Sequence, residues 1–126
     1  MFDKHVVTTQ FAGRELTLET GELARQASGS VKVTYGGTVI LATAVIEDEP
    51  GSASFLPLRV DFEEKMYAIG QIPGGFFKRE GRPSPEAILI SRSIDRPIRP
   101  LLPGGLRNEV QVICTPLSAE NDSSAE

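Results

Sequence analysis

Polar and apolar residues alternate over several short stretches in the first half of the chain. The alternation covers residues 16–20, 30–35 and 58–63, and a period of two residues is that of a β-strand with one buried face. Residues 6–11 precede the first of these stretches, and Ala12-Gly13-Arg14 between the two predicts a hairpin turn. We therefore predict that the chain opens with antiparallel strands.

Residues 38–46 differ from these stretches because they are apolar on both faces. Such a strand is typical of the middle of a sheet that is covered on both sides. Gly36 and Gly37 just before it predict a tight hairpin with the 30–35 strand, since both glycines can adopt positive φ. We expect an acidic loop over residues 47–54. Residues 21–27 have a composition that would suit a helix, but we predict an extended connection there.

The pattern changes in the second half of the chain. Glycine and proline crowd residues 69–83 and predict a loop. Ser84-Pro85-Glu86 predicts the start of a helix, with a capping hydroxyl, a proline at the first position and an acid in the first turn. Pro97 disfavours helical angles at the residue before it, so we expect the helix to end near Asp95 or Arg96.

Residues 108–115 predict the last strand, with Val110, Val112 and Cys114 on one face. The order of strands, loop, one helix and strand indicates an α+β fold rather than alternating βα units. We assign residues 1–118 to a single folded unit and residues 119–126 to a polar, acidic end that adds no further element.

The composition is that of a globular chain, with 126 residues of which 40% are hydrophobic and 24% charged. The longest apolar run, 39–46, is far shorter than the roughly 20 residues of a membrane-spanning helix. There is one cysteine and no secretory leader pattern, so we expect a cytoplasmic protein. The net charge of −4 conceals a basic segment, because residues 78–99 contain six basic and three acidic side chains.

The most informative chemistry lies in the glycine-rich loop, which contains Phe76, Phe77, Lys78, Arg79 and Arg82. Exposed aromatic rings beside cations suit single-stranded nucleic acid, because bases stack on rings and phosphates pair with cations. The alternative is that both rings anchor the loop to the domain or fill a contact between subunits.

Three arginines form the second candidate site. Arg92 and Arg96 are four residues apart and so share one face of the predicted helix, and Arg99 follows beyond the proline. They suit a phosphate or anion site. The alternative is a solvated or paired face, since Asp95 is within reach of Arg92 and Arg99. We identify no catalytic set and no metal-ligand set, and we expect His5 at the surface and Cys114 to be a buried, inert thiol.

The segment 72–103, IPGGFFKREGRPSPEAILISRSIDRPIRPLLP, closely resembles the signature of the bacterial polynucleotide phosphorylase (polyribonucleotide nucleotidyltransferase) family, as do residues 18–21, 24–27 and 108–112. The resemblance implies the opening part of the first ribonuclease-PH-like domain, a β-α-β type of α+β fold in which a helix packs on a mixed sheet. It also implies that the fold is incomplete here, because family members are several times longer and add a second such domain and KH and OB-fold domains.

The resemblance further implies processive 3′ to 5′ phosphorolysis of single-stranded mRNA by a cytoplasmic homotrimer, with inorganic phosphate as co-substrate, Mg²⁺ as cofactor and nucleoside diphosphates as products. A larger RNA-degrading complex is an implied partner, and no membrane is. The phosphate and metal ligands belong to the second domain, so no catalytic or metal residue carries over. The aromatic and basic loop at Phe76, Phe77, Lys78 and Arg79 matches the family's RNA-gripping loop, in which Arg is more common at the position of Lys78. Arg82 and the three helix arginines also match family positions.

Two other interpretations remain from the sequence. One is a structural, subunit-contact module without RNA affinity of its own. The other is a ribonuclease PH-type tRNA-processing enzyme, a poorer match because the Phe-Phe-Lys-Arg run at 76–79 and the Asp-Arg-Pro-Ile-Arg-Pro run at 95–100 point away from it.

Overall fold

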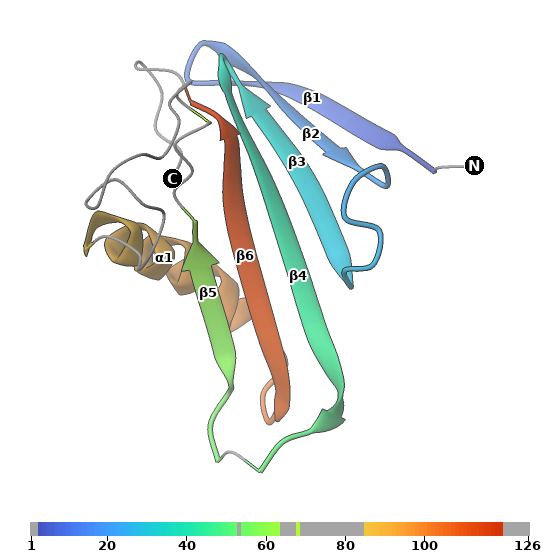
Figure 1. Ribbon diagram of the computed structural model, residues 1–126, viewed down its shortest axis with the longest axis vertical. Helices are drawn as coiled ribbons and strands as arrows, with labels where there is room; N and C mark the ends of the chain where they lie inside the picture. Colours follow the sequence, from blue (N-terminus) through green and yellow to red (C-terminus); the bar gives the residue numbers. More distant parts are fainter. Residues whose placement is uncertain (1–2, 53, 64–67, 69–84, 120–126) are drawn as a thin grey trace, which may run out of the picture.

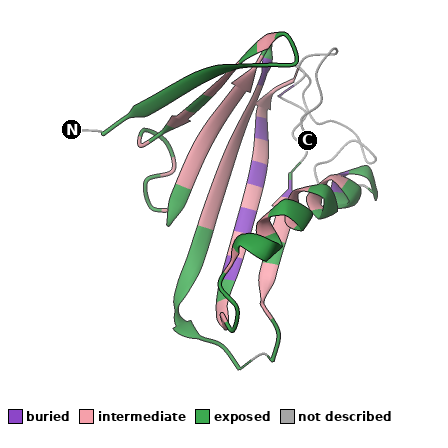
Figure 2. Cartoon of the chain, turned by 180° about the vertical axis from the view of Figure 1, so that it is seen from behind, coloured by how far each residue is buried: buried purple, intermediate pink, exposed green. Residues whose placement is uncertain are grey.

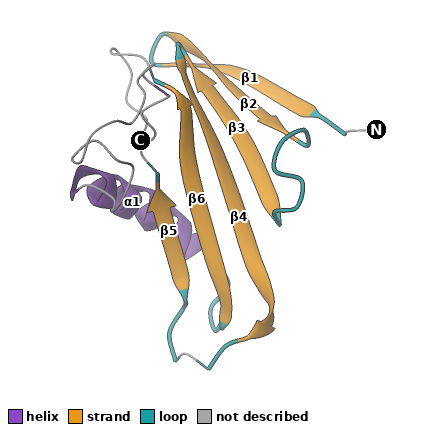
Figure 3. Ribbon diagram, viewed as in Figure 1, coloured by secondary structure: helices purple, strands orange, loops and turns teal. Residues whose placement is uncertain are grey.

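A computed structural model describes residues 3–52, 54–63, 68 and 85–119 of the chain. These residues form a curved sheet with one helix on a single face (Figure 1). Figure 3 shows the same view by secondary structure. The elements in chain order are β1 (His5–Phe11), β2 (Arg14–Thr20), β3 (Gly29–Tyr35), β4 (Thr38–Pro50), β5 (Leu58–Phe62), α1 (Pro85–Ile98), the short 3₁₀ helix η2 (Arg99–Leu101) and β6 (Asn108–Ser118).

The strands lie in the order β1-β2-β3-β4-β6-β5. The neighbouring pairs β1–β2, β2–β3, β3–β4 and β4–β6 are antiparallel, whereas β5 and β6 are parallel. A parallel pair needs a crossover, and α1 supplies it between β5 and β6. The predicted α+β class, with a helix packed on a mixed sheet, is therefore confirmed.

Both predicted hairpins are present. Phe11 pairs with Arg14 across a two-residue turn in which Ala12 and Gly13 have φ of 50° and 81°, the positive values that suit the twist of such hairpins. Tyr35 pairs with Thr38 across the two glycines, as expected. Residues 21–28 form no helix, in agreement with the prediction, but they are a series of turns rather than an extended segment.

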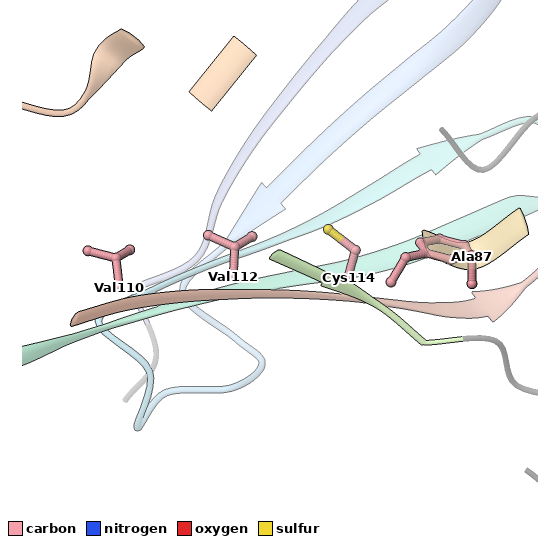
Figure 4. Close-up of a cluster of buried hydrophobic side chains, with 5 residues drawn as sticks. Ala87, Val110, Val112 and Cys114 are labelled. Carbon is pink, nitrogen blue, oxygen red and sulfur yellow. The ribbon is translucent and has the colours of Figure 1, made fainter. Parts of the chain in front are cut away.

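The core lies between α1 and the sheet. Val110, Val112 and Cys114 project from one side of β6 towards the helix, and Ala87 meets them from α1 (Figure 4). Ala87 is completely buried, so the helix approaches the sheet closely at this point. On α1, Ile90, Ile94 and Ile98 complete the contact at helical spacing. Figure 2 shows this buried strip running along β6 beneath the helix.

β4 is a central strand, as predicted, but its cover differs from the prediction. Ile40, Ala42 and Ala44 pack on the core beneath the helix. Because side chains alternate along a strand, Leu41 and Val45 lie on the opposite face, where Val45 is 45% exposed. Within the described parts of the chain, therefore, cover is substantial on one face of the strand only.

The strand β4 also continues further than predicted, through residues expected to form an acidic loop. The Asn108 side-chain amide donates hydrogen bonds to the carbonyls of Glu47 (2.8 Å) and Asp48 (3.3 Å). Pro50 pairs with Asn108, after a bulge that follows Ile46. The backbone of an exposed, charged segment thus becomes a strand because β6 supplies partners, and these partners lie about 60 residues away in the sequence.

The helix ends later than predicted. It includes Pro97, continues to Ile98 and passes into η2. Proline removes one backbone donor from the last turn, but Ile98 packs against the core and Asp95 bonds Arg99 across the proline. These tertiary contacts outweigh the local preference of the residue before proline for extended angles.

Candidate functional site

The predicted loop residues Phe76, Phe77, Lys78, Arg79 and Arg82 lie outside the described residues. The two ends of their segment are well defined. Phe62 at the end of β5 and Ala87 in the first turn of α1 belong to the same buried cluster. The Phe62 amide donates a hydrogen bond to Ser91 Oγ (2.9 Å), and this hydroxyl donates to the carbonyl of Ala87 (2.9 Å). Phe62 and Ala87, which flank this segment in the sequence, therefore lie together at one corner of the sheet.

Local sequence explains why α1 forms here and how it is oriented. Pro85 occupies the first helical position and Glu86 places a negative charge in the first turn, where it interacts favourably with the helix dipole. The isoleucines and Ala87 turn one face to the sheet. This leaves Arg92 and Arg96 exposed, with Ile88 and Leu89 also on the solvent side at 46% and 61% exposure.

Arg99 is held by a forked ion pair. Its Nε and Nη2 donate to the two carboxylate oxygens of Asp95, each at 2.9 Å. Nη2 also lies 3.5 Å from the carbonyl oxygen of Leu58. The hydrogen bond from Arg99 lowers the pKa of Asp95, and the same bond raises the pKa of Arg99. The pair neutralises both charges and ties the end of α1 to β5.

Arg92 and Arg96 differ from Arg99 in this respect. They lie one helical turn apart, and among the described residues neither side chain has a hydrogen-bond or ion-pair partner. The structure thus confirms that they share a face of the helix, and it leaves their guanidinium groups exposed to solvent.

A shallow cavity of about 220 Å³ lies between α1 and the outer edge of β5, with Arg92, Asp61 and Asp95 in its wall. Both carboxylates already have guanidinium partners, because Asp61 bonds Arg59 at 2.9 Å and Asp95 bonds Arg99. The cavity and its immediate partners therefore carry one positive charge in excess, contributed by Arg92. Such an arrangement suits a weak anion contact at the solvent-exposed side of the helix.

His5 and Cys114 lie where the sequence predicts them. His5 lies at the surface, 3.4 Å from Asp3. Cys114 is buried, and burial raises the pKa of its thiol, so it is a poor nucleophile. Among the described residues, no three His, Cys, Asp or Glu side chains gather as metal ligands.

The sequence placed Asp95 within reach of both Arg92 and Arg99, and the structure pairs it with Arg99. The role of Ser91 was not anticipated. The side chain of Ser91 accepts the hydrogen bond from the outer edge of β5, 29 residues away in sequence. The sequence signal for this role is the position of Ser91 on the helix face that carries Ala87 and Ile94, because a hydroxyl that faces a sheet needs a hydrogen-bond partner.

The comparisons with known proteins agree with the fold. The sequence pattern of the 3′ exoribonuclease family, domain 1, matches residues 12–125, and the chain belongs to this family. Among characterised sequences, it is similar to the polyribonucleotide nucleotidyltransferases of Staphylococcus saprophyticus (59% identical), Bacillus licheniformis (57%) and Bacillus subtilis (56%). Each match covers 124 residues, or 98% of this chain.

The same matches cover 18% of the length of each of these relatives. The chain therefore corresponds to less than a fifth of a polyribonucleotide nucleotidyltransferase, and the family assignment places it at the first domain. No helix among the described residues is long and apolar enough to cross a membrane.

Proposed function

We propose that this chain acts as the opening segment of a polyribonucleotide nucleotidyltransferase that degrades single-stranded RNA processively from the 3′ end by phosphorolysis and releases nucleoside diphosphates. In this proposal the segment supplies scaffold, contacts of a homotrimer and an RNA-guiding loop. The catalytic centre lies elsewhere in the protein. The observation that carries the proposal is the similarity to enzymes of that name over 98% of the chain.

The anchoring of the loop supports its assigned role. Phe62 and Ala87, described residues on the two sides of the segment that contains Phe76 to Arg79, are joined through hydrogen bonds of Ser91. A rigid base of this kind suits a loop that must hold its rings and cations at a fixed entrance. Arg82 lies in the same loop and adds a further cation for RNA phosphates.

The role of the three arginines follows from their different surroundings. Arg92 and Arg96 are exposed on the helix that follows the loop, so we assign them to contacts with RNA phosphates or other anions. Arg99 is occupied by Asp95, and its proposed role is to position the end of the helix. It is therefore the weakest of the three as an anion ligand.

In this proposal, Mg²⁺ is bound by other parts of the longer protein. The described residues offer no group of three candidate ligands, so no step of the reaction is assigned to a metal held by this segment. Mg²⁺, inorganic phosphate and the active-site ligands belong to the longer protein, as does association with other RNA-degrading proteins in the cytoplasm.

A chimaera tests the proposal directly. Residues 1–126 of this chain replace the corresponding part of the S. saprophyticus enzyme, which is 59% identical over the matched region. We expect the chimaera to form the oligomer of its parent and to release nucleoside diphosphates from oligoadenylate in the presence of phosphate and Mg²⁺. A chimaera that folds and assembles but has lost phosphorolysis would contradict the proposal.

Loop variants of the same chimaera separate guiding from scaffolding. Phe77→Ala should weaken oligoadenylate binding by about 1–3 kcal/mol with little salt dependence, because the ring no longer stacks on a base. Lys78→Ala with Arg79→Ala should lower the slope of log affinity against log salt by roughly 0.7 for each RNA phosphate that is no longer neutralised. If Phe77→Ala instead lowers the melting temperature with RNA binding intact, the ring is an anchor and the segment is a structural module.

A further inference from the structure

The backbone groups of β5 point alternately towards β6 and towards the outer edge of the sheet. The Glu63 amide donates a hydrogen bond to a carbonyl of β6 (2.9 Å), and the carbonyl of Pro57 accepts one from an amide of β6 (3.0 Å). In this parallel pairing the odd-numbered residues of β5 therefore bond β6. The amides and carbonyls of Leu58, Val60 and Phe62 point outward, to the side where α1 lies.

Side chains of α1 occupy outward-pointing groups at both ends of β5 but not in its middle. Ser91 Oγ accepts from the Phe62 amide at 2.9 Å, and Arg99 Nη2 lies 3.5 Å from the carbonyl oxygen of Leu58. Among the described residues, neither the amide nor the carbonyl of Val60 has a hydrogen-bond partner. Val60 lies in the wall of the cavity of about 220 Å³ between α1 and β5. The cavity therefore presents a donor beside an acceptor, both held in place by the sheet.

The other residues of the cavity wall favour a ligand with a neutral polar ring and a separate negative charge. Ile88 contributes an apolar side chain that is 46% exposed. The carboxylates of Asp61 and Asp95 are unfavourable neighbours for an anion. Among the described residues of this wall, Arg92 is the one cation, and its guanidinium has no partner. A ring at Val60 and an anion at Arg92 would satisfy both parts of the wall.

We propose that this cavity binds one nucleotide, with the base hydrogen-bonded to the amide and carbonyl of Val60 and the phosphate bound by Arg92. Each of the four bases carries a donor next to an acceptor on its Watson–Crick edge, and one extended residue offers the complementary pair. The site therefore accepts a nucleotide of any sequence. The inference rests on the phosphate contact proposed above for Arg92, but not on phosphorolysis by the longer protein.

The size of the cavity agrees with a single base. Sites that enclose a complete drug-sized ligand have volumes of roughly 300–1,000 Å³, whereas this cavity has about 220 Å³. One base can enter it, and the sugar and phosphate remain outside on the exposed side of α1. A nucleotide of an RNA strand and a free nucleotide share this chemistry, so the test includes both.

Hydrogen exchange of the Val60 amide tests the proposal in the chimaera. This amide should exchange rapidly in the empty cavity and slowly once a base accepts its hydrogen bond. Mass spectrometry of the peptide that contains β5 counts the protected amides, with AMP, ribose 5-phosphate and oligoadenylate as probes. We expect AMP to protect one further amide and ribose 5-phosphate, which has the phosphate but no base, to protect none. Protection by oligoadenylate at lower concentration than AMP identifies RNA as the source, and protection by AMP alone identifies a free nucleotide.

A matched pair of variants shows whether the protection arises in this cavity. Ile88 and Leu89 are both exposed on α1, but Leu89 does not belong to the cavity wall. Ile88→Phe fills the cavity and should abolish the protection by AMP, whereas Leu89→Phe should retain it. Arg92→Ala should raise the AMP concentration needed for half-maximal protection about tenfold, because a charge-assisted bond is lost. The melting temperature of each variant reports whether the fold is kept.

Three results would overturn the proposal. One is a Val60 amide that is protected without any nucleotide, because another part of the longer protein would then cover the cavity. The others are equal protection in the Ile88→Phe and Leu89→Phe variants, and protection by ribose 5-phosphate equal to that by AMP. Phosphorolysis by the chimaera is measured separately. Activity without protection by either nucleotide probe contradicts this inference alone, whereas protection without activity contradicts the proposed function alone.

Discussion

At the scale of single residues, Asp95 and Arg99 form the best-defined polar contact of the helix. Replacing Asp95 by Asn removes the forked pair, and we expect the melting temperature to fall by about 2–4 °C. Arg96→Ala is the matched control, because Arg96 has no partner within the described chain and its replacement should leave the melting temperature unchanged. Equal decreases in the two variants would contradict this account.

The same pair has a defined pH dependence. The pKa of Asp95 is lower in the folded chain than its ordinary value, so the carboxylate stabilises the fold above the ordinary carboxyl range. That contribution disappears as the pH falls through the lowered pKa. The difference in melting temperature between wild type and Asp95→Asn should accordingly shrink on acidification. A difference that grows with acid would rule out the ion pair as its source.

Arg92 and Arg96 lead to a separate prediction about RNA. In the chimaera, Arg92→Ala with Arg96→Ala should lower the slope of log affinity for oligoadenylate against log salt by about 0.7 for each arginine that binds a phosphate, or about twice that for both. Arg99→Ala serves as a control, since its guanidinium is already occupied by Asp95. If Arg99→Ala changes the slope as much as the double variant, the distinction among the three arginines is wrong.

Ser91 and Ser93 provide a matched pair for the contact between α1 and β5. Ser91→Ala removes the acceptor of the Phe62 amide, and we expect the free energy of unfolding to fall by about 1–2 kcal/mol. Among the described residues, the Ser93 hydroxyl bonds just the Leu89 carbonyl of its own helix, at the surface, so Ser93→Ala should have almost no effect. Urea unfolding of both variants decides the matter, and comparable decreases would speak against the edge contact.

The sequence allowed residue-scale predictions where the cause is local. The proximity of Asp95 to Arg92 and Arg99 in the sequence allowed an ion pair to be expected with either arginine, and the burial of Cys114 follows from alternation along one strand. The contact of Ser91 with β5 could not be predicted, because it depends on how the helix is placed over a strand distant in sequence.

At the scale of elements, Gly21 fixes the position of the first strand. Its φ is 94°, and a Cβ there would collide with the backbone of Asp3 and Lys4. We expect Gly21→Ala to cost about 1–3 kcal/mol, because both the left-handed backbone and the close approach become unfavourable. Gly29→Ala is the control, since a Cβ there meets nothing within 4 Å. Similar unfolding free energies for the two variants would contradict this role.

The boundaries of elements show where sequence patterns fail. Strand centres and hairpins were predictable because alternation and glycine pairs are local features. The extension of β4 to Pro50 and of α1 through Pro97 was not predictable, because Asn108 and the packing of Ile98 supply stabilisation from elsewhere in the fold. Local preferences thus set the interiors of elements, whereas tertiary contacts set their ends.

At the scale of the whole molecule, the chain contains a small core and corresponds to 18% of its relatives. We expect the isolated chain to release no nucleoside diphosphate from oligoadenylate with phosphate and Mg²⁺, whereas the chimaera does so. Chromatography of the products against a no-enzyme control measures this. Release that a substitution in the purified chain abolishes would show that the segment has a catalytic centre of its own.

The position of β6 between β4 and β5 has a consequence for how the chain acquires its fold during synthesis. Strands β1 to β4 pair with sequence neighbours and can form as soon as they emerge, but β4 pairs Leu41 with Thr115. Until β6 has been synthesised, the edge of β4 that pairs with it has no partner. Bringing residues 41 and 115 together closes a long loop, which is slow. During synthesis the chain therefore passes through a partly folded, aggregation-prone state. Chaperones that bind unpaired strands would act on this state.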